Sequence, residues 1–65
     1  MEENTIQLDQ FLKSQGVVAS GGEAKHLVQN GEVSVNGEVE TRRGRKLKNG
    51  DSVSVAGQSF VVTLN

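Results

Sequence analysis

The chain has 65 residues, of which 34 % are hydrophobic and only two, both phenylalanines, are aromatic, and its formal net charge is −1 at pH 7. This length predicts a single domain over residues 1–65 with a small core, which excludes a deep substrate cavity. The absence of cysteine excludes disulfides and thiolate chemistry and fits a reducing compartment, so we expect a cytoplasmic protein. No apolar run approaches the roughly 20 residues that span a bilayer, and the Met-Glu-Glu-Asn start lacks the features of a signal peptide, so no membrane association or export is expected.

Two helices are predicted in the first half of the chain. Residues 5–7 predict a short edge strand, and apolar residues at 8, 11 and 12 have the spacing of a helical face that ends at Gly16. Ser20 followed by Glu23 is the pattern of a capping box, which predicts a second helix from about residue 21 to residue 30.

The second half of the chain predicts short antiparallel strands. Val33 and Val35 alternate with polar residues, residues 36–37 (Asn-Gly) favour a tight hairpin turn, and Val39 lies on the return strand. Further apolar alternation follows over residues 53–64, interrupted by a turn at Ala56-Gly57. The expected fold class is therefore α+β, with two short N-terminal helices packed on a small antiparallel sheet of about 3–5 strands.

Five of the seven lysines and arginines lie within seven residues, namely Arg42, Arg43, Arg45, Lys46 and Lys48. By formal charge, residues 1–41 carry −5, residues 42–48 carry +5 and residues 49–65 carry −1. A dense cationic loop on an acidic remainder favours a polyanion, of which phosphate is the commonest. A solvated loop without a partner is the alternative. As exposed loop charges, these side chains are expected to add little to stability.

Several motifs follow one another in a recognisable order: Leu8-Asp9, Phe11-Leu12, Ala24, Leu27-Val28, Gly31 and Val33-Ser34-Val35-Asn36-Gly37. This order resembles the S-four (S4) RNA-binding domain, whose fold is called the alpha-L motif and whose most specific mark is the Gly-x-Val-x-Val-Asn-Gly stretch. The resemblance covers about residues 6–55, and residues 20–25 and 40–46 resemble the short, free-standing bacterial members in particular. It implies a ribosome-associated protein whose second helix, hairpin and following loop lie on structured RNA, mostly against backbone phosphates.

The resemblance and the charges together select the candidate RNA-binding residues. The first group is Lys25, Arg42, Arg43, Arg45, Lys46 and Lys48, and a second group is Lys13, Ser20, Gly21, Gly22 and His26. Many members of the family carry Arg at the positions of Gln7 and Gly21, so two phosphate contacts are missing here and weak or partner-assisted binding is expected. With five to seven phosphate contacts, log K should fall against log salt with a slope of roughly −3.5 to −6.

Some of these residues have a second interpretation. Ser20, Gly21 and Gly22 open a helix and offer backbone N–H groups to an anion, but Ser20 and Glu23 can equally satisfy the helix end as a plain capping box. His26 follows Glu23 by three residues, yet the chain has no second histidine and no cysteine with which to complete a metal site. No metal, cofactor or catalytic residue is expected.

The function predicted from the sequence is that of a non-catalytic protein that binds structured RNA, ribosomal or transfer RNA, mainly through its phosphates. Phe11 and Phe60 fall in apolar patterns, so they are expected in the core rather than as stacking platforms for single-stranded bases. The alternative is a protein-interaction adapter whose basic loop docks an acidic partner. Neither prediction includes a membrane or a small-molecule substrate.

Overall fold

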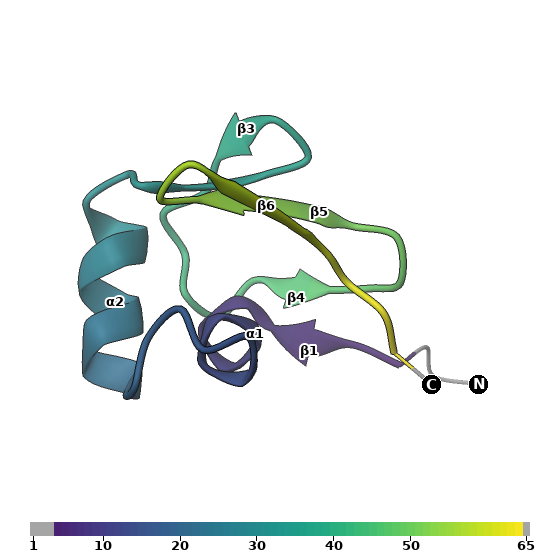
Figure 1. Cartoon of the computed structure of the whole chain (residues 1–65), viewed down its shortest axis with the longest axis horizontal. Helices are drawn as coiled ribbons and strands as arrows, with labels where there is room; N and C mark the ends of the chain where they lie inside the picture. Colours follow the sequence, from purple (N-terminus) through teal and green to yellow (C-terminus); the bar gives the residue numbers. More distant parts are fainter. Residues whose placement is uncertain (1–3, 65) are drawn as a thin grey trace.

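The structure is a computed structural model that describes residues 4–64. Its elements in chain order are β1 (Ile6–Gln7), α1 (Leu8–Ser14), α2 (Gly21–Gln29), β2 (Val33–Val35), β3 (Glu38–Val39), β4 (Lys46–Leu47), β5 (Ser52–Val55) and β6 (Gln58–Val61). The strands form a two-stranded antiparallel sheet, β1-β4, and a four-stranded antiparallel sheet in the order β3-β2-β5-β6 (Figure 1). The α+β fold class is confirmed, although the strands are divided between two sheets instead of one.

The end of α1 and the start of α2 lie where the sequence predicts them. At the end of α1, the N–H groups of Gly16 and Val17 donate to the carbonyls of Lys13 and Leu12, and Gly16 has the positive φ of 76° that this termination requires. At the start of α2, Ser20 Oγ accepts the N–H of Glu23 at 3.3 Å, while Glu23 Oε1 accepts the N–H of Ala19 at 3.1 Å. The predicted capping box is thus confirmed, except that Glu23 accepts the N–H of Ala19, one residue before the N-cap Ser20 whose N–H is the usual donor.

Two-residue turns set the register of the four-stranded sheet. Asn36 and Gly37 have φ values of 53° and 87°, and this turn pairs Val35 with Glu38 and Ser34 with Val39. The second turn, at residues 56–57, has φ values of 55° and 76° and joins β5 to β6. Positive φ at both central residues matches the twist of a two-residue hairpin.

A single apolar core lies between the helices and the two sheets. Its fully buried side chains include Leu8 and Leu12 of α1, Val28 of α2 and Leu47 of β4. Phe11 is buried and meets the half-buried Phe60 edge-on, with ring centroids 6.5 Å apart. The prediction that both phenylalanines belong to the core is confirmed.

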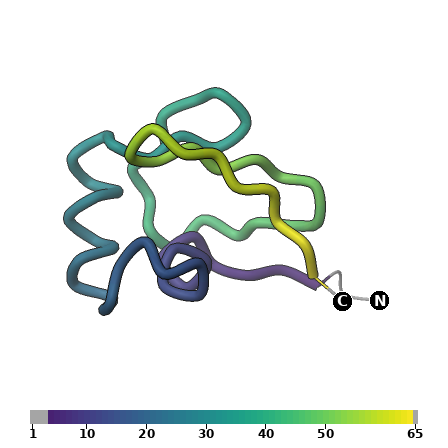
Figure 2. Tube along the Cα trace, viewed as in Figure 1, coloured from purple at the N-terminus to yellow at the C-terminus, as the bar shows by residue number. Residues whose placement is uncertain are grey.

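The chain between β3 and β4 connects the two sheets. After the hairpin it leaves the four-stranded sheet and runs down to the two-stranded sheet, where β4 pairs with β1 (Figure 2). The connection carries three arginines, Arg42, Arg43 and Arg45, so the fold places these cations between the two sheets and next to α1.

Candidate nucleic-acid interface

The basic segment, defined here as residues 42–48, is held by its backbone against the start of α1. The N–H of Leu8 donates to the carbonyl of Arg45 at 2.8 Å, and the N–H of Asp9 donates to the carbonyl of Arg43 at 3.0 Å. Gln7, the residue immediately before α1, makes no side-chain cap. The carbonyls of the basic segment therefore satisfy donors that a helix start leaves free, and in return the helix fixes the path of the segment.

A buried carboxylate precedes the basic segment and binds two of its arginines. Glu40 is only 6 % exposed. Its Oε2 accepts the backbone N–H and Nε–H of Arg42 at 3.0 and 3.1 Å, and its Oε1 accepts Nη1–H of Arg45 at 2.9 Å. The hydrogen bonds from Arg42, then those from Arg45, lower the pKa of Glu40 from 4.5 to about 2. Glu40 therefore stays charged and shapes the start of the segment.

This carboxylate bears on one expectation from the sequence, that the basic side chains are exposed loop charges that add little to stability. The Arg45 side chain is only 31 % exposed and lies against Glu40, whereas that of Arg42 is 78 % exposed although it bonds the same carboxylate. Because removal of either arginine would leave a buried charge with fewer donors, these two residues have a structural role.

Sequence reasoning missed Glu40, although the signal was present. The two-residue turn pairs Val39 with Ser34. Ser34 lies on the face of the sheet opposite to the one on which Val33 and Val35 are buried. Val39 is accordingly 61 % exposed, and Glu40, whose N–H donates to the carbonyl of Val33 at 2.9 Å, points to the core side. The register of the hairpin thus predicted an inward carboxylate.

The remaining cations of the basic segment face solvent, and none of them forms an ion pair with a carboxylate of residues 4–64. Within residues 4–64, the ion pairs are those of Glu40 with Arg42 and Arg45. Arg43, Lys46 and Lys48 are exposed, and the two lysines flank buried Leu47, which places them on one face of the strand.

The end of the basic segment is also fixed. Asp51 is buried, and its Oδ2 accepts the N–H of Lys48 at 3.0 Å while its Oδ1 accepts an N–H of the Asn36 amide at 3.2 Å. The hydrogen bond from the Lys48 backbone is the main cause of the lowered pKa of Asp51. The segment is thus tied to α1 at its middle and to the hairpin turn at its end.

Two of the other predicted cations, Lys13 and Lys25, lie on the two helices. Lys13 of α1 and Gly21 of α2 line a shallow hollow of about 140 Å³ together with Asp9, the residue whose N–H binds the basic segment. Lys25 follows Gly21 by four residues, so it lies on the same side of α2. Lys13 and Lys25 thus lie around the contact between α1 and α2, and α1 in turn holds the basic segment. We call Lys13, Lys25, Arg43, Lys46 and Lys48 the cationic surface.

The start of α2 is occupied by its own cap. Ser20 Oγ and the carboxylate of Glu23 both bond backbone donors there. A phosphate held by Ser20, Gly21 and Gly22 stays a prediction, and it would have to approach beside the Glu23 charge.

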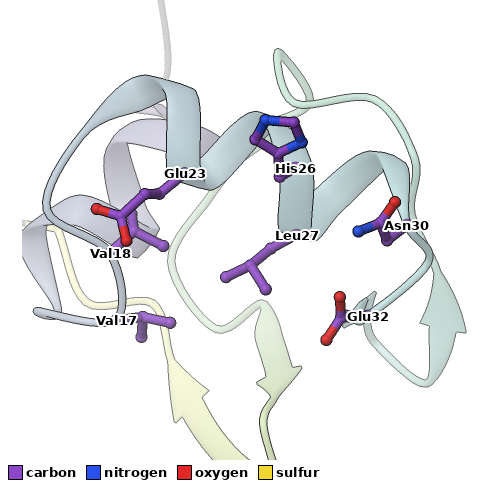
Figure 3. Close-up of a pocket in the computed structure, with 7 residues that line it drawn as sticks. All are labelled: Val17, Val18, Glu23, His26, Leu27, Asn30 and Glu32. Carbon is purple, nitrogen blue, oxygen red and sulfur yellow. The ribbon is translucent and has the colours of Figure 1, made fainter.

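His26 lies away from the cationic surface. It lines a second hollow, of about 370 Å³, whose other members are Val17, Val18, Glu23, Leu27, Asn30 and Glu32 (Figure 3). The residues that share this hollow with His26 thus include the carboxylates Glu23 and Glu32 and no lysine or arginine. Among the described residues, no group of three or more His, Cys, Asp or Glu side chains is arranged to hold a metal ion. In the same part of the chain, neither helix has the length and apolar character needed to cross a membrane.

Comparison with known proteins gives concordant matches. A family model described as "S4 domain" matches residues 1–63. The "Probable ribosome maturation protein RlbA" of Bacillus subtilis (strain 168) is 52 % identical over 52 residues, which cover 80 % of this chain and 73 % of that protein. The "Putative RNA-binding protein YbcJ" of Escherichia coli (strain K12) is 42 % identical over 57 residues, or 88 % of this chain and 81 % of that protein.

A solved structure shares the fold. The crystal structure of the 30S ribosomal protein S4e from Thermoplasma acidophilum superposes with a TM-score of 0.73 over 98 % of this chain, which corresponds to 34 % of that protein. The two sequences are 20 % identical in this region, so the likeness concerns the fold alone.

Proposed function

This chain belongs to the S4 domain family, and on that premise we propose that it is a non-catalytic protein that binds structured RNA, ribosomal or transfer RNA, mainly through backbone phosphates. We further propose that residues 1–65 act as one S4-type unit in the cytoplasm, in association with the ribosome or its assembly. The names of the relatives from Bacillus subtilis and Escherichia coli, which refer to ribosome maturation and RNA binding, support this proposal.

The observation that carries the proposal is the fixed basic segment, whose Arg43, Lys46 and Lys48 form no ion pair within residues 4–64. Because α1, Glu40 and Asp51 hold its backbone, exposed Arg43, Lys46 and Lys48 are presented from a fixed backbone instead of a mobile tail. Arginine offers a planar fork to phosphate oxygens and lysine a mobile point charge. Lys13 and Lys25 enlarge this surface beyond the basic segment.

The same geometry favours phosphate contacts over base reading. Phe11 is buried in the core, and half-buried Phe60 packs edge-on against it, so neither ring is presented as a free stacking platform for a base. Phosphate contacts position a protein without reading sequence, so selectivity would come from the shape of the folded RNA.

The absence of catalysis is part of the proposal. The two buried carboxylates, Glu40 and Asp51, are engaged by Arg42, Arg45, Lys48 and Asn36 in bonds that hold the fold. Engaged in this way, neither carboxylate is left to act as an acid or base on a substrate.

A salt series tests the proposal. Within residues 4–64, five cations form no ion pair, and they predict a slope of about −3.5 to −4.5 for log K against log salt. Arg42 and Arg45 share the single negative charge of Glu40, so together they add at most one further phosphate contact to this slope. We would measure fluorescence anisotropy of a labelled, folded ribosomal RNA fragment at increasing salt, with the double variant K46S/K48S as the site variant. The matched control is the double variant Q15S/Q58S, which replaces two exposed, uncharged side chains outside the cationic surface.

The outcomes separate the two function classes. Binding with this slope, weakened most in K46S/K48S, supports the proposed interface. No binding at low salt, together with binding to an acidic protein, would reject RNA as the partner and favour the adapter alternative.

A further inference from the structure

The second hollow, beside His26, has no part in the proposed RNA interface. It is formed by the segment between the helices, by one side of α2 and by the residue that leads into β2 (Figure 3). Glu23, His26, Leu27 and Asn30 share this side of α2 because they are spaced by three and four residues. Gly21 and Lys25 lie on a different side, so α2 separates the hollow from the cationic surface.

The floor of the hollow is apolar. Val17 and Leu27 are half-buried, Val18 is buried, and the side chain of Leu27 points into the middle of the hollow in Figure 3. Both half-buried side chains pack against the core and still offer apolar surface to the hollow. An apolar side chain from a partner could cover this surface and remove it from water.

The rim of the hollow is acidic at two separated points. The carboxylate of Glu23 lies beside Val18, and that of Glu32 lies on the far side of Leu27 (Figure 3). Within residues 4–64 neither carboxylate forms an ion pair, although Glu23 accepts the N–H of Ala19. Both are exposed, and the apolar floor lies between them. A polyanion such as RNA would be repelled here, whereas a cationic segment would be attracted.

We propose that this hollow docks a cationic protein segment in which an apolar side chain is flanked by lysine or arginine. The apolar side chain would pack on Leu27 and Val17, and the flanking cations would pair with Glu23 and Glu32. The chain would then bind RNA on one surface and a basic protein segment on another, with opposite charges on its two surfaces. This inference stands independently of the RNA proposal, because it uses none of the residues of the cationic surface.

The test uses a defined probe, a blocked peptide with leucine at its centre and two lysines on each side. Binding is followed by amide chemical shifts of the full chain during titration, and by competition for a labelled copy of the peptide. We expect shifts at Val17, Leu27 and Glu32. Two comparison peptides isolate each contribution: one has serine in place of leucine, and one has glutamate in place of every lysine.

Charge variants test whether Glu23 and Glu32 bind the lysines of the probe peptide. Glu32→Lys should weaken binding of the probe by at least about tenfold, since it places like charges opposite one another. Glu23→Gln should weaken it severalfold while its amide oxygen still accepts the N–H of Ala19, so the helix start is preserved. The matched control is Glu38→Lys, which makes the same change of charge at an exposed carboxylate outside the hollow and should leave the affinity within about twofold.

Other results would overturn the proposal. Equal binding of the leucine and serine peptides would mean unspecific charge attraction, and shifts that avoid the hollow would place the peptide elsewhere. Shifts at Leu27 and Glu32 that depend on protein concentration without peptide would identify a second copy of the chain as the occupant. Shifts there on addition of folded RNA would assign the hollow to RNA. The RNA titration of the cationic surface is a separate measurement, so failure of one proposal leaves the other testable.

Discussion

The Glu40 carboxylate and the Arg45 guanidinium lie 2.9 Å apart, and this ion pair joins the end of the hairpin to the start of β4. The negative charge of Glu40 therefore lies directly before the basic segment and cancels part of the positive charge of that segment. In exchange, Arg42 and Arg45 are fixed, and the carbonyls of Arg43 and Arg45 are directed at the start of α1. The ion pairs with Glu40 thus lower the positive field of the proposed interface and fix the shape of its backbone. A fixed shape suits the recognition of a folded RNA more than that of an extended strand.

Replacing Glu40 with glutamine should destabilise the protein. The amide cannot pair with two guanidinium groups, and Arg45 would keep a half-buried charge without its counter-ion. We expect the free energy of unfolding to fall by about 2 to 3 kcal/mol, less than for a fully buried pair because Arg42 is exposed. Urea denaturation followed by circular dichroism measures this, with Glu38→Gln, an exposed carboxylate on the same hairpin, as the control. Equal midpoints for both variants would show that the ion pairs add nothing.

Stability should decrease in acid through the same carboxylate. The pKa of Glu40 is lowered from 4.5 to about 2 in the folded protein, so the unfolded chain binds more protons between these values. The contribution of Glu40 is present above about pH 4.5 and is lost as the pH falls toward 2. Asp51, whose pKa is also lowered, acts in the same direction. The slope of unfolding free energy against pH in this window should be clearly smaller for Glu40→Gln, and an unchanged slope would contradict the assignment.

Local features of the fold were predictable because neighbouring residues determine them. Ser20 with Glu23 fixes the start of α2, Gly16 ends α1, and the turn at residues 36–37 sets its own hairpin. The pairing of Ile6 with Leu47 was not predictable, since it joins segments far apart in the sequence through a core that exists only in the folded chain. The division of the strands into two sheets follows from that pairing.

The candidate site was predictable in composition and less so in arrangement. The sequence identified the cations, but it treated all of the basic segment as solvated, because charge counting does not see that Glu40 faces inward. His26 was a candidate for the same RNA interface as Lys25, yet one residue along a helix turns the side chain by about 100°, and His26 lines the second hollow. Both differences arise from side-chain direction, which charge counting along the chain leaves out.

Asn36 should stabilise the junction between the hairpin and the basic segment. It has a φ of 53°, its amide Nδ2 donates to Asp51 at 3.2 Å, and its Oδ1 accepts the N–H of Ser52 at 2.9 Å. Asn36→Ala loses both bonds and places a residue that tolerates positive φ poorly in the turn, so the free energy of unfolding should fall by about 1 to 2 kcal/mol. Thermal unfolding measures the effect. Asn36→Gly, which restores the backbone freedom alone, should recover part of it, and no recovery would assign the whole loss to the hydrogen bonds.

Arg43 and Arg45, two residues apart, should respond to alanine substitution in opposite ways. Arg43 is exposed, and only its backbone carbonyl serves the fold, so Arg43→Ala should change stability by less than about 0.5 kcal/mol. It should weaken RNA binding and reduce the magnitude of the salt slope by about 0.7 to 0.9. Arg45→Ala removes a partner of buried Glu40 and should cost about 1 to 2 kcal/mol of stability, with a smaller change in slope because that charge is already compensated. Denaturation and RNA titration of both variants decide this, and a larger change in slope for Arg45→Ala would mean that RNA displaces Glu40 from the arginine.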